Sequence, residues 1–118
     1  MKFTKYDCKC GEYCNARLMH ICDDLLTVIN EVEHHFNEKI IVIDAIRCRL
    51  YNHQLGGREE SYHLYAMAVD FKINRFNVFD IYDFLIKRYP HTLGIIVHTT
   101  ANFIHVDVRK IKERGIKL

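Results

Sequence analysis

The chain has 118 residues, which is enough for one compact hydrophobic core and too few for two. Hydrophobic residues make up 49% and charged residues 27% of it, and these ordinary globular values exclude an intrinsically disordered chain. The formal net charge is only +2 and the basic residues are scattered, so we expect no nucleic-acid partner. We expect a single domain that spans residues 1–118.

The sequence shows no recognisable targeting or membrane-spanning segment. Residues 1–7 contain no apolar run of the kind found in signal peptides, and no stretch of the sequence is long enough to span a bilayer. We therefore expect synthesis in the cytoplasm and no transmembrane segment.

Near the C-terminus, Arg109, Lys110, Lys112 and Arg114 form a basic cluster. We interpret this cluster as a solvated tail, with weak attraction to peptidoglycan or nucleic acid as the alternative.

The cysteines are five in number: Cys8, Cys10, Cys14, Cys22 and Cys48. An odd count without a signal peptide argues against a disulfide framework. The first three could bind a metal, with His20 as a conceivable fourth ligand. Their spacing is not the paired Cys-x2-Cys of common zinc sites, however, and cysteine is often a small buried hydrophobe. We therefore interpret them as packing residues, with a second metal site as the alternative.

The clearest helix is predicted over residues 16–36, with Asn15 as its N-cap. Apolar residues recur there at steps of three and four, which is typical of a helix with one buried face. His34 and His35 lie at its C-terminal end, where the helix dipole favours an imidazolium. We prefer that explanation to a ligand role for either histidine.

A β-branched run at residues 40–43 predicts a central strand. It leads into a long loop over residues 48–60, with Gly56-Gly57 as the turn signal. A loop of this length in a compact domain is usually functional. A second strand is expected over residues 66–73, after the segment 61–65.

A second helix is expected to begin after Asn77, which with Asp80 three residues later forms a capping-box-like start. Pro90 ends this helix near residue 89. Strands at residues 94–98 and 102–108 then form a hairpin. Helices and strands do not alternate regularly, so we predict an α+β fold, a small antiparallel sheet with helices packed to one side.

Two short motifs carry the chemistry of the sequence. Ser61-x-His63 is followed by Asp70 in the second strand, and His105-x-Asp107 lies in the last strand. Side chains two apart on a strand share a face, so His105 and Asp107 point the same way. Two histidines and one aspartate form a neutral-nitrogen and carboxylate set that suits Zn²⁺ and leaves a fourth position open.

These motifs, Ser-x-His with Ala-x-Asp-Phe and then Phe-x-His-x-Asp-x-Arg, resemble those of the M15-type zinc D,D-peptidases and L-Ala–D-Glu endopeptidases. The non-catalytic signalling domain of Hedgehog shares their fold. The resemblance covers nearly the whole chain and implies the same α+β architecture. It implies that Zn²⁺ is bound by His63, Asp70 and His105.

The resemblance also implies substrate-binding residues. Arg47, Asn52 and Gly56-Gly57 fall at positions that match the family pattern, while Asp44-Ala45 replace the usual Ser-Gly. The matching arginine contacts substrate near the scissile bond, so Arg47 is the candidate cation for the developing oxyanion. Ser61 is a further candidate for substrate binding. The alternative for Arg47 is a simple salt bridge to Asp44.

The general base is the residue that the resemblance identifies least well. Several branches of the family carry Glu or His two or three residues before the last metal ligand, where this chain has Asn102 and Phe103. We favour Asp107 as the base, followed by His98 across the predicted hairpin. The alternative is that Asp107 orients an imidazole or Arg109 without taking a proton itself.

The sequence thus predicts a zinc-dependent metallopeptidase that hydrolyses amide bonds in peptidoglycan stem peptides, as a D,D-carboxypeptidase or murein endopeptidase. The missing signal peptide suits a phage-encoded protein that reaches the cell wall by lysis or as a virion component. The alternative is a non-catalytic zinc-binding module that acts as a structural or recognition domain. The sequence does not indicate an oligomeric state.

Overall fold

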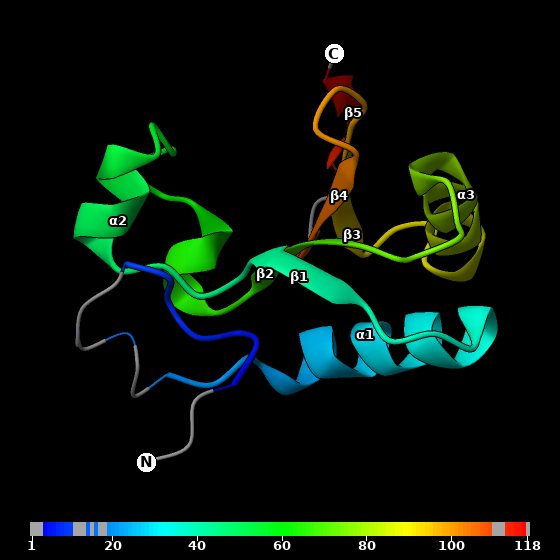
Figure 1. The fold of residues 1–118 in the computed structure, drawn as a ribbon, viewed down its shortest axis with the longest axis horizontal. Helices are drawn as coiled ribbons and strands as arrows, with labels where there is room; N and C mark the ends of the chain where they lie inside the picture. Colours follow the sequence, from blue (N-terminus) through cyan, green and yellow to red (C-terminus); the bar gives the residue numbers. More distant parts are fainter. Residues whose placement is uncertain (1–3, 11–13, 15, 17–18, 110–112, 118) are drawn as a thin grey trace.

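The computed structural model describes residues 4–10, 14, 16, 19–109 and 113–117. Within these residues the chain forms three α-helices, a short 3-10 helix and a five-stranded sheet (Figure 1). In chain order the elements are α1 (Asp23–Phe36), β1 (Ile41–Asp44), α2 (Arg49–Gln54), η2 (Tyr62–Tyr65), β2 (Ala68–Lys72), α3 (Val78–Arg88), β3 (Leu93–His98), β4 (Phe103–Val108) and β5 (Glu113–Lys117). None of the described helices is long and apolar enough to cross a membrane.

The strand order of the sheet is β1-β2-β4-β3-β5. The first four strands are antiparallel to their neighbours, and β5 is parallel to β3. The predicted hairpin of β3 and β4 is confirmed, and Asn102 in its turn has a φ of 57°, a left-handed conformation that asparagine tolerates well. The predicted α+β class is confirmed.

Alternation along the strands divides the sheet into an apolar face and a polar face. On the apolar face, Val69 and Phe71 of β2 lie opposite Val106 and Ile104 of β4, and all four are fully buried. The buried residues of α1 and α3 join them in one core, so these two helices cover this face. The polar face therefore looks away from the core, and α2 lies on that side of the sheet (Figure 1).

Helix α1 begins later than the sequence predicts, at Asp23 and not at residue 16. The proposed N-cap Asn15 lies outside the described residues. Cys22 is the actual N-cap residue, and its backbone N–H donates to the carbonyl of Ala66 at 3.0 Å. Residues 19–21 just before it are not helical, and Ile21 is buried among them. The apolar character of Ile21 thus reflects burial and not helical periodicity.

The region between β1 and η2 also differs from the prediction. Strand β1 lies at the edge of the sheet and not at its centre, and its Ile41 and Ile43 side chains are exposed. A β-branched run identifies a strand but cannot tell an edge from a centre. The predicted loop contains α2, whose six residues are too few to show a helical period. Cys48 caps this helix by accepting a hydrogen bond from the Tyr51 N–H.

The predicted solvated tail is wrong at Arg109. Arg109 has a side chain only 15% exposed and pairs with Asp107. Residues 113–117 form β5 beside β3. Residues 110–112 lie outside the described residues.

The predicted start of α3 is confirmed. The Asn77 side chain accepts a hydrogen bond from the Phe79 N–H at 2.8 Å, and the Asp80 carboxylate accepts one from the Asn77 N–H. These bonds satisfy backbone donors that the first turn of a helix leaves unpaired.

We expect Asn77→Ala to lower the free energy of unfolding by about 1 kcal/mol, the usual contribution of an N-cap side chain. Urea denaturation followed by circular dichroism measures this change. Asn77→Ser retains a capping oxygen and serves as the control, with an expected loss of only a few tenths of a kcal/mol. Equal stability of the alanine variant and the unaltered protein would show that the cap contributes nothing.

Candidate active site

The three predicted metal ligands meet on the polar face of the sheet. Asp70 of β2 and His105 of β4 are register partners, and His105 Nδ1 lies 2.8 Å from Asp70 Oδ1. His63 comes from η2, and its Nε2 lies 3.2 Å from the same carboxylate oxygen. One potential ligand atom from each of the three residues lies within 4.8 Å of the other two. The structure therefore brings His63, Asp70 and His105 together around one point.

The orientation of His63 directs its Nε2 atom toward the other two predicted ligands. Its Nδ1 lies 2.5 Å from the carbonyl oxygen of Ala45, which can only accept, so Nδ1 carries the proton. Nε2 then faces Asp70 Oδ1. The Ser61 hydroxyl accepts a hydrogen bond from the His63 N–H at 3.2 Å and fixes the start of η2. His63 is 2% exposed, so its ring has little freedom to turn.

His105 lies between two carboxylates. Its Nε2 is 2.7 Å from Asp107 Oδ2, while its Nδ1 faces Asp70. Burial disfavours the imidazolium, but the hydrogen bonds to Asp107 and Asp70 outweigh it and raise the pKa of His105 to about 9. Burial also opposes ionisation of Asp70, yet hydrogen bonds from His105 and His63 hold its pKa below the usual range. The two carboxylates and His105 thus stabilise one another's charged forms.

Asp107 is held on the far side of the His105 ring from Asp70. Arg109 donates to both of its oxygens through Nε and Nη2, and the Asp107 side chain has no exposed surface. Although burial raises the pKa of Asp107, the bonds from His105 and Arg109 lower it below the usual range. Gly94 on β3 makes room for this pair, because a Cβ there would lie 2.4 Å from Asp107 Oδ1. Both oxygens of Asp107 are thus engaged within the protein.

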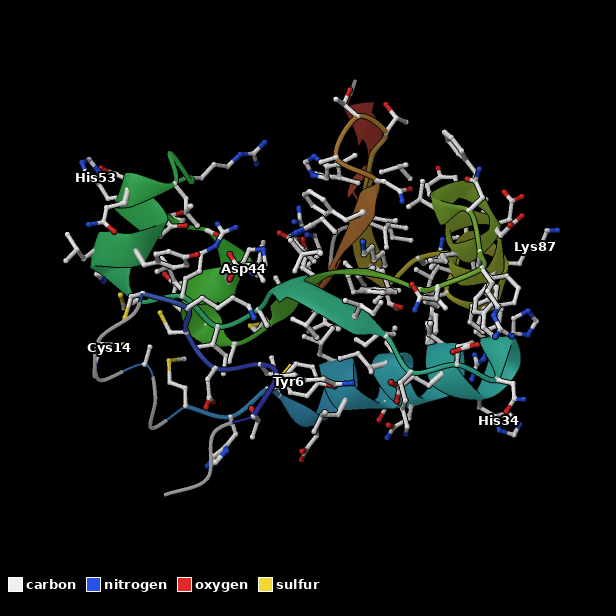
Figure 2. The ribbon with its side chains drawn as sticks, viewed as in Figure 1. Tyr6, Cys14, His34, Asp44, His53 and Lys87 are labelled. Atoms are coloured by element: carbon white, nitrogen blue, oxygen red, sulfur yellow. The ribbon has the colours of Figure 1, made fainter. Side chains whose placement is uncertain are left out.

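Arg47 forms the salt bridge to Asp44 that the sequence offered as the alternative, and it also lies beside Asp70. Its Nε donates to Asp44 Oδ2 at 2.5 Å, and its Nη2 lies 3.6 Å from Asp70 Oδ2. Asp44 ends β1, and Figure 2 shows it between α2 and the sheet. The salt bridge to Asp44 therefore does not remove Arg47 from the site but aims its guanidinium at Asp70.

Asn52 and Gly57 secure Arg47 from the other side. Asn52 accepts from Arg47 Nη1 at 3.0 Å and donates to the carbonyl of Arg58 at 2.8 Å. A Cβ on Gly57 would lie 2.2 Å from the Asn52 side chain, so glycine allows the loop to close over it. Asn52 is 3% exposed and buried under this loop, which makes it a residue that positions Arg47.

A cleft of about 240 Å³ opens over these groups. Of the residues predicted from the sequence, the cleft is lined by Arg47, Ser61, His63, Asp70, His98 and His105, whereas Asn52 and Asp107 are not among its lining residues. The sequence prediction missed Arg58, Glu60, Tyr62, Ile96, Phe103 and Arg109, which complete the lining.

Two of these lining groups could have been found from the sequence. Glu60 directly precedes Ser61, so it was bound to lie near the Ser-x-His element. Phe103 lies two residues before His105 on β4 and therefore shares its face. In the structure the ring of His98 stacks on Phe103 with centroids 4.3 Å apart. This contact fixes the imidazole of His98 at the edge of the cleft.

A comparison with protein families identifies the chain. The model of the family described as Peptidase M15 matches residues 3–107. The chain belongs to the peptidase M15 family. No curated protein and no solved structure gives a significant match.

M15 peptidases generally depend on zinc, and the residues at the cleft fit that ion. The donor set has two imidazole nitrogens and one carboxylate, which are zinc ligands of ordinary type. The other ring nitrogen of His63 donates a hydrogen bond to a backbone carbonyl, and that of His105 donates one to a carboxylate, which is the arrangement that usually orients zinc-binding histidines. His63, Asp70 and His105 therefore form a candidate metal site in this M15 peptidase.

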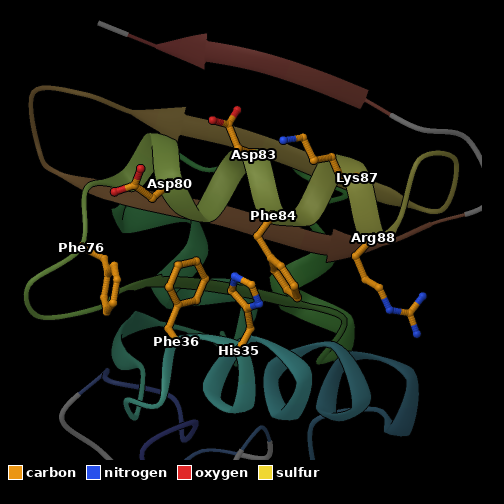
Figure 3. A pocket seen from close by; sticks show the side chains of 8 residues that line it. All are labelled: His35, Phe36, Phe76, Asp80, Asp83, Phe84, Lys87 and Arg88. Carbon is orange, nitrogen blue, oxygen red and sulfur yellow. The ribbon is translucent and has the colours of Figure 1, made fainter.

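A wider recess of about 720 Å³ lies elsewhere, between α1 and α3. Figure 3 shows His35 and Phe36 of α1 facing Phe84 of α3 in it, and the rings of His35 and Phe84 stack with centroids 4.1 Å apart. This recess lies on the helical side of the sheet, away from His63 and His105. His35 is thus a packing residue at the end of α1, and we do not include it in the site.

We expect Asp107→Asn to weaken zinc binding at the cleft by about 10–100-fold, the usual effect of losing a carboxylate that orients a metal-binding histidine. Competition with a chromophoric chelator measures this affinity. Asp83→Asn makes the same chemical change on an exposed part of α3 and should leave the affinity unchanged. Unchanged zinc affinity together with a large loss of rate in Asp107→Asn would instead identify Asp107 as the general base.

Proposed function

We propose that this M15 peptidase is a zinc-dependent enzyme that hydrolyses amide bonds in peptidoglycan stem peptides, as a D,D-carboxypeptidase or murein endopeptidase. The observation that carries this proposal is the convergence of His63 Nε2, His105 Nδ1 and Asp70 Oδ1 beneath a cleft, in a chain of a peptidase family. Three protein ligands leave a coordination position open, which is the arrangement of catalytic zinc sites and not of structural ones.

The protein groups around the ligands have separable tasks. Zinc held by His63, Asp70 and His105 would supply a Lewis acid that polarises the scissile carbonyl and activates water. The Ala45 carbonyl fixes the tautomer of His63 by accepting its Nδ1 proton. Asp107 does the same for His105 by accepting the Nε2 proton.

We assign Asp107 to orientation and not to proton transfer. Its oxygens are occupied by His105 and Arg109, and its side chain has no exposed surface through which water could approach. The ring of His105 also lies between Asp107 and Asp70. The base is therefore sought among the groups that line the cleft.

His98 is the group that we assign to proton transfer. It lines the cleft on β3, two residues from Ile96, whose register partner is His105. Stacking on Phe103 holds its ring on that face of the sheet. A neutral imidazole in this position can accept a proton from water and return it to the leaving amine. Glu60, an exposed carboxylate on the rim of the same cleft, is the alternative candidate that we consider.

The charge of the cleft favours an anionic substrate. Asp44, Asp70 and Asp107 are faced by the guanidiniums of Arg47 and Arg109. A divalent ion on these residues would leave one net positive charge close to the cleft. The carboxylates of stem peptides and the developing oxyanion of amide hydrolysis both suit that field. Arg47 is the cation held in place to contact them.

The proposal is tested by digesting purified muropeptides with the protein and identifying the products by mass spectrometry. We expect cleavage of one stem-peptide amide bond, its loss with a chelator, and its return with added zinc. His105→Ala removes a ligand and should abolish cleavage without restoration by zinc.

A protein that holds zinc at His63, Asp70 and His105 but cleaves no stem peptide would instead be a non-catalytic zinc-binding module of the same fold. Asn102 and Phe103, at the positions where several family branches carry the base, are the feature that favours this alternative.

The assignment of the base is tested separately with His98→Asn. We expect this variant to retain its zinc and to lose roughly 10²–10⁴-fold in rate, the usual contribution of general base catalysis. Glu60→Gln is the matched comparison, because it removes the charge of the alternative base while keeping the shape of the side chain. A large loss in Glu60→Gln with little change in His98→Asn would move the role to Glu60.

A further inference from the structure

Four of the five cysteines meet at one place outside the cleft. Cys8, Cys10 and Cys14 come from the N-terminal arm, and Cys48 comes from the N-terminal end of α2. The four sulfurs all lie within 4.8 Å of one another. Figure 2 shows Cys14 beneath α2, on the side of the molecule away from α3. We propose that these four thiolates bind a second zinc ion in a closed, structural site.

The geometry of the cluster is close to that of a tetrathiolate site. Tetrahedral zinc with Zn–S distances of about 2.3 Å places its sulfurs roughly 3.8 Å apart, so each sulfur would need to move by less than about 1 Å. Four sulfur ligands without nitrogen or carboxylate select zinc over the harder cations. With all four positions filled by protein, no place remains for water or substrate, which makes the site structural and not catalytic.

The backbone around the sulfurs supports a charged cluster. The Cys48 N–H donates to Cys8 Sγ at 3.3 Å, and the Tyr51 N–H donates to Cys48 Sγ at 3.4 Å. Such N–H groups stabilise metal-bound thiolates. Arg47 and Arg49 line the recess beside Cys10, Cys14 and Cys48, so positive charge stands near a centre that would carry a net charge of two minus.

Simple packing does not account for the cluster. Cys8 lies in the core, and Cys10, Cys14 and Cys48 are partly buried against it, but packing alone gives no reason for four sulfurs to converge on one point. Cys22 also packs against the core, and it lies outside the group. His20, the fourth ligand considered from the sequence, is exposed and is replaced in the group by Cys48.

The second zinc would join the N-terminal arm to the segment that carries Arg47. The arm already pairs with this segment, since the Ile46 N–H donates to the carbonyl of Tyr6 at 3.1 Å. Cys48 follows Arg47 directly in the chain. A zinc ion bound across both segments would stabilise the folded protein, since the unfolded chain offers no preformed site. It would also limit the movement of Arg47 relative to the cleft.

The test uses the full chain, loaded with zinc under a non-chelating reductant, and measures the zinc content per chain by elemental analysis and native mass spectrometry. We expect two equivalents in the unaltered protein and one in Cys10→Ser/Cys14→Ser. His63→Ala/His105→Ala should also retain one. Cys22→Ser and His20→Ala are the matched controls and should keep both.

Cobalt identifies which ligands hold the metal, and it needs no change to the cysteines. His63→Ala/His105→Ala loaded with Co²⁺ should show the near-ultraviolet absorption of sulfur-to-cobalt charge transfer, which a nitrogen and carboxylate site does not produce. Absence of that absorption in this variant and in the unaltered protein would overturn the proposal. So would disulfides among the four cysteines, detected by mass spectrometry of the protein as purified.

The two zinc sites can fail independently. If the unaltered protein cleaves no stem peptide but shows the thiolate–cobalt absorption, the proposed peptidase function is rejected and the cysteine site is supported. Cleavage by a protein that holds only the zinc of His63, Asp70 and His105 would do the reverse.

Discussion

The site depends on one buried carboxylate. Asp70 lies on the second strand of the sheet and is 6% exposed. Its Oδ1 contacts ring nitrogens of both His63 and His105, and its Oδ2 lies near the guanidinium of Arg47. A buried carboxylate without such partners would be costly, because the protein interior solvates charge poorly. Two of the partners that stabilise Asp70, His63 and His105, are also residues of a type that binds zinc. The interactions that stabilise Asp70 therefore also bring the candidate metal ligands together.

The sheet explains how these partners are held with little freedom. Strands β2 and β4 pair in a register that sets Asp70 against His105, while their alternate residues Val69 and Val106 are buried beneath α1 and α3. A slip of one residue would exchange the two faces, placing the charged groups in the core and the apolar ones at the cleft. Hydrophobic packing on one face thus fixes the polar geometry on the other.

Further hydrogen bonds fix the side-chain orientations that strand pairing alone does not determine. Ala45 orients His63, Asp107 orients His105, and Asn52 orients Arg47. Glycines allow this close packing at two points, Gly57 against Asn52 and Gly94 against Asp107. Each of these residues acts on the cleft through another side chain, and neither Asn52 nor Asp107 is among the residues that line the cleft.

The sequence by itself determined the α+β class, the start of α3 and the grouping of Asp107 with His105, because these features depend on local patterns of capping and alternation. The tertiary structure decided other features. The start of α1 depends on a hydrogen bond to the carbonyl of Ala66, more than forty residues away in the chain. The role of Asp107 depends on which side of the His105 ring it occupies, and alternation specifies only the face. The cysteine group needed Cys48 to be brought beside the N-terminal arm, since convergence of distant segments is set by packing and not by spacing along the chain.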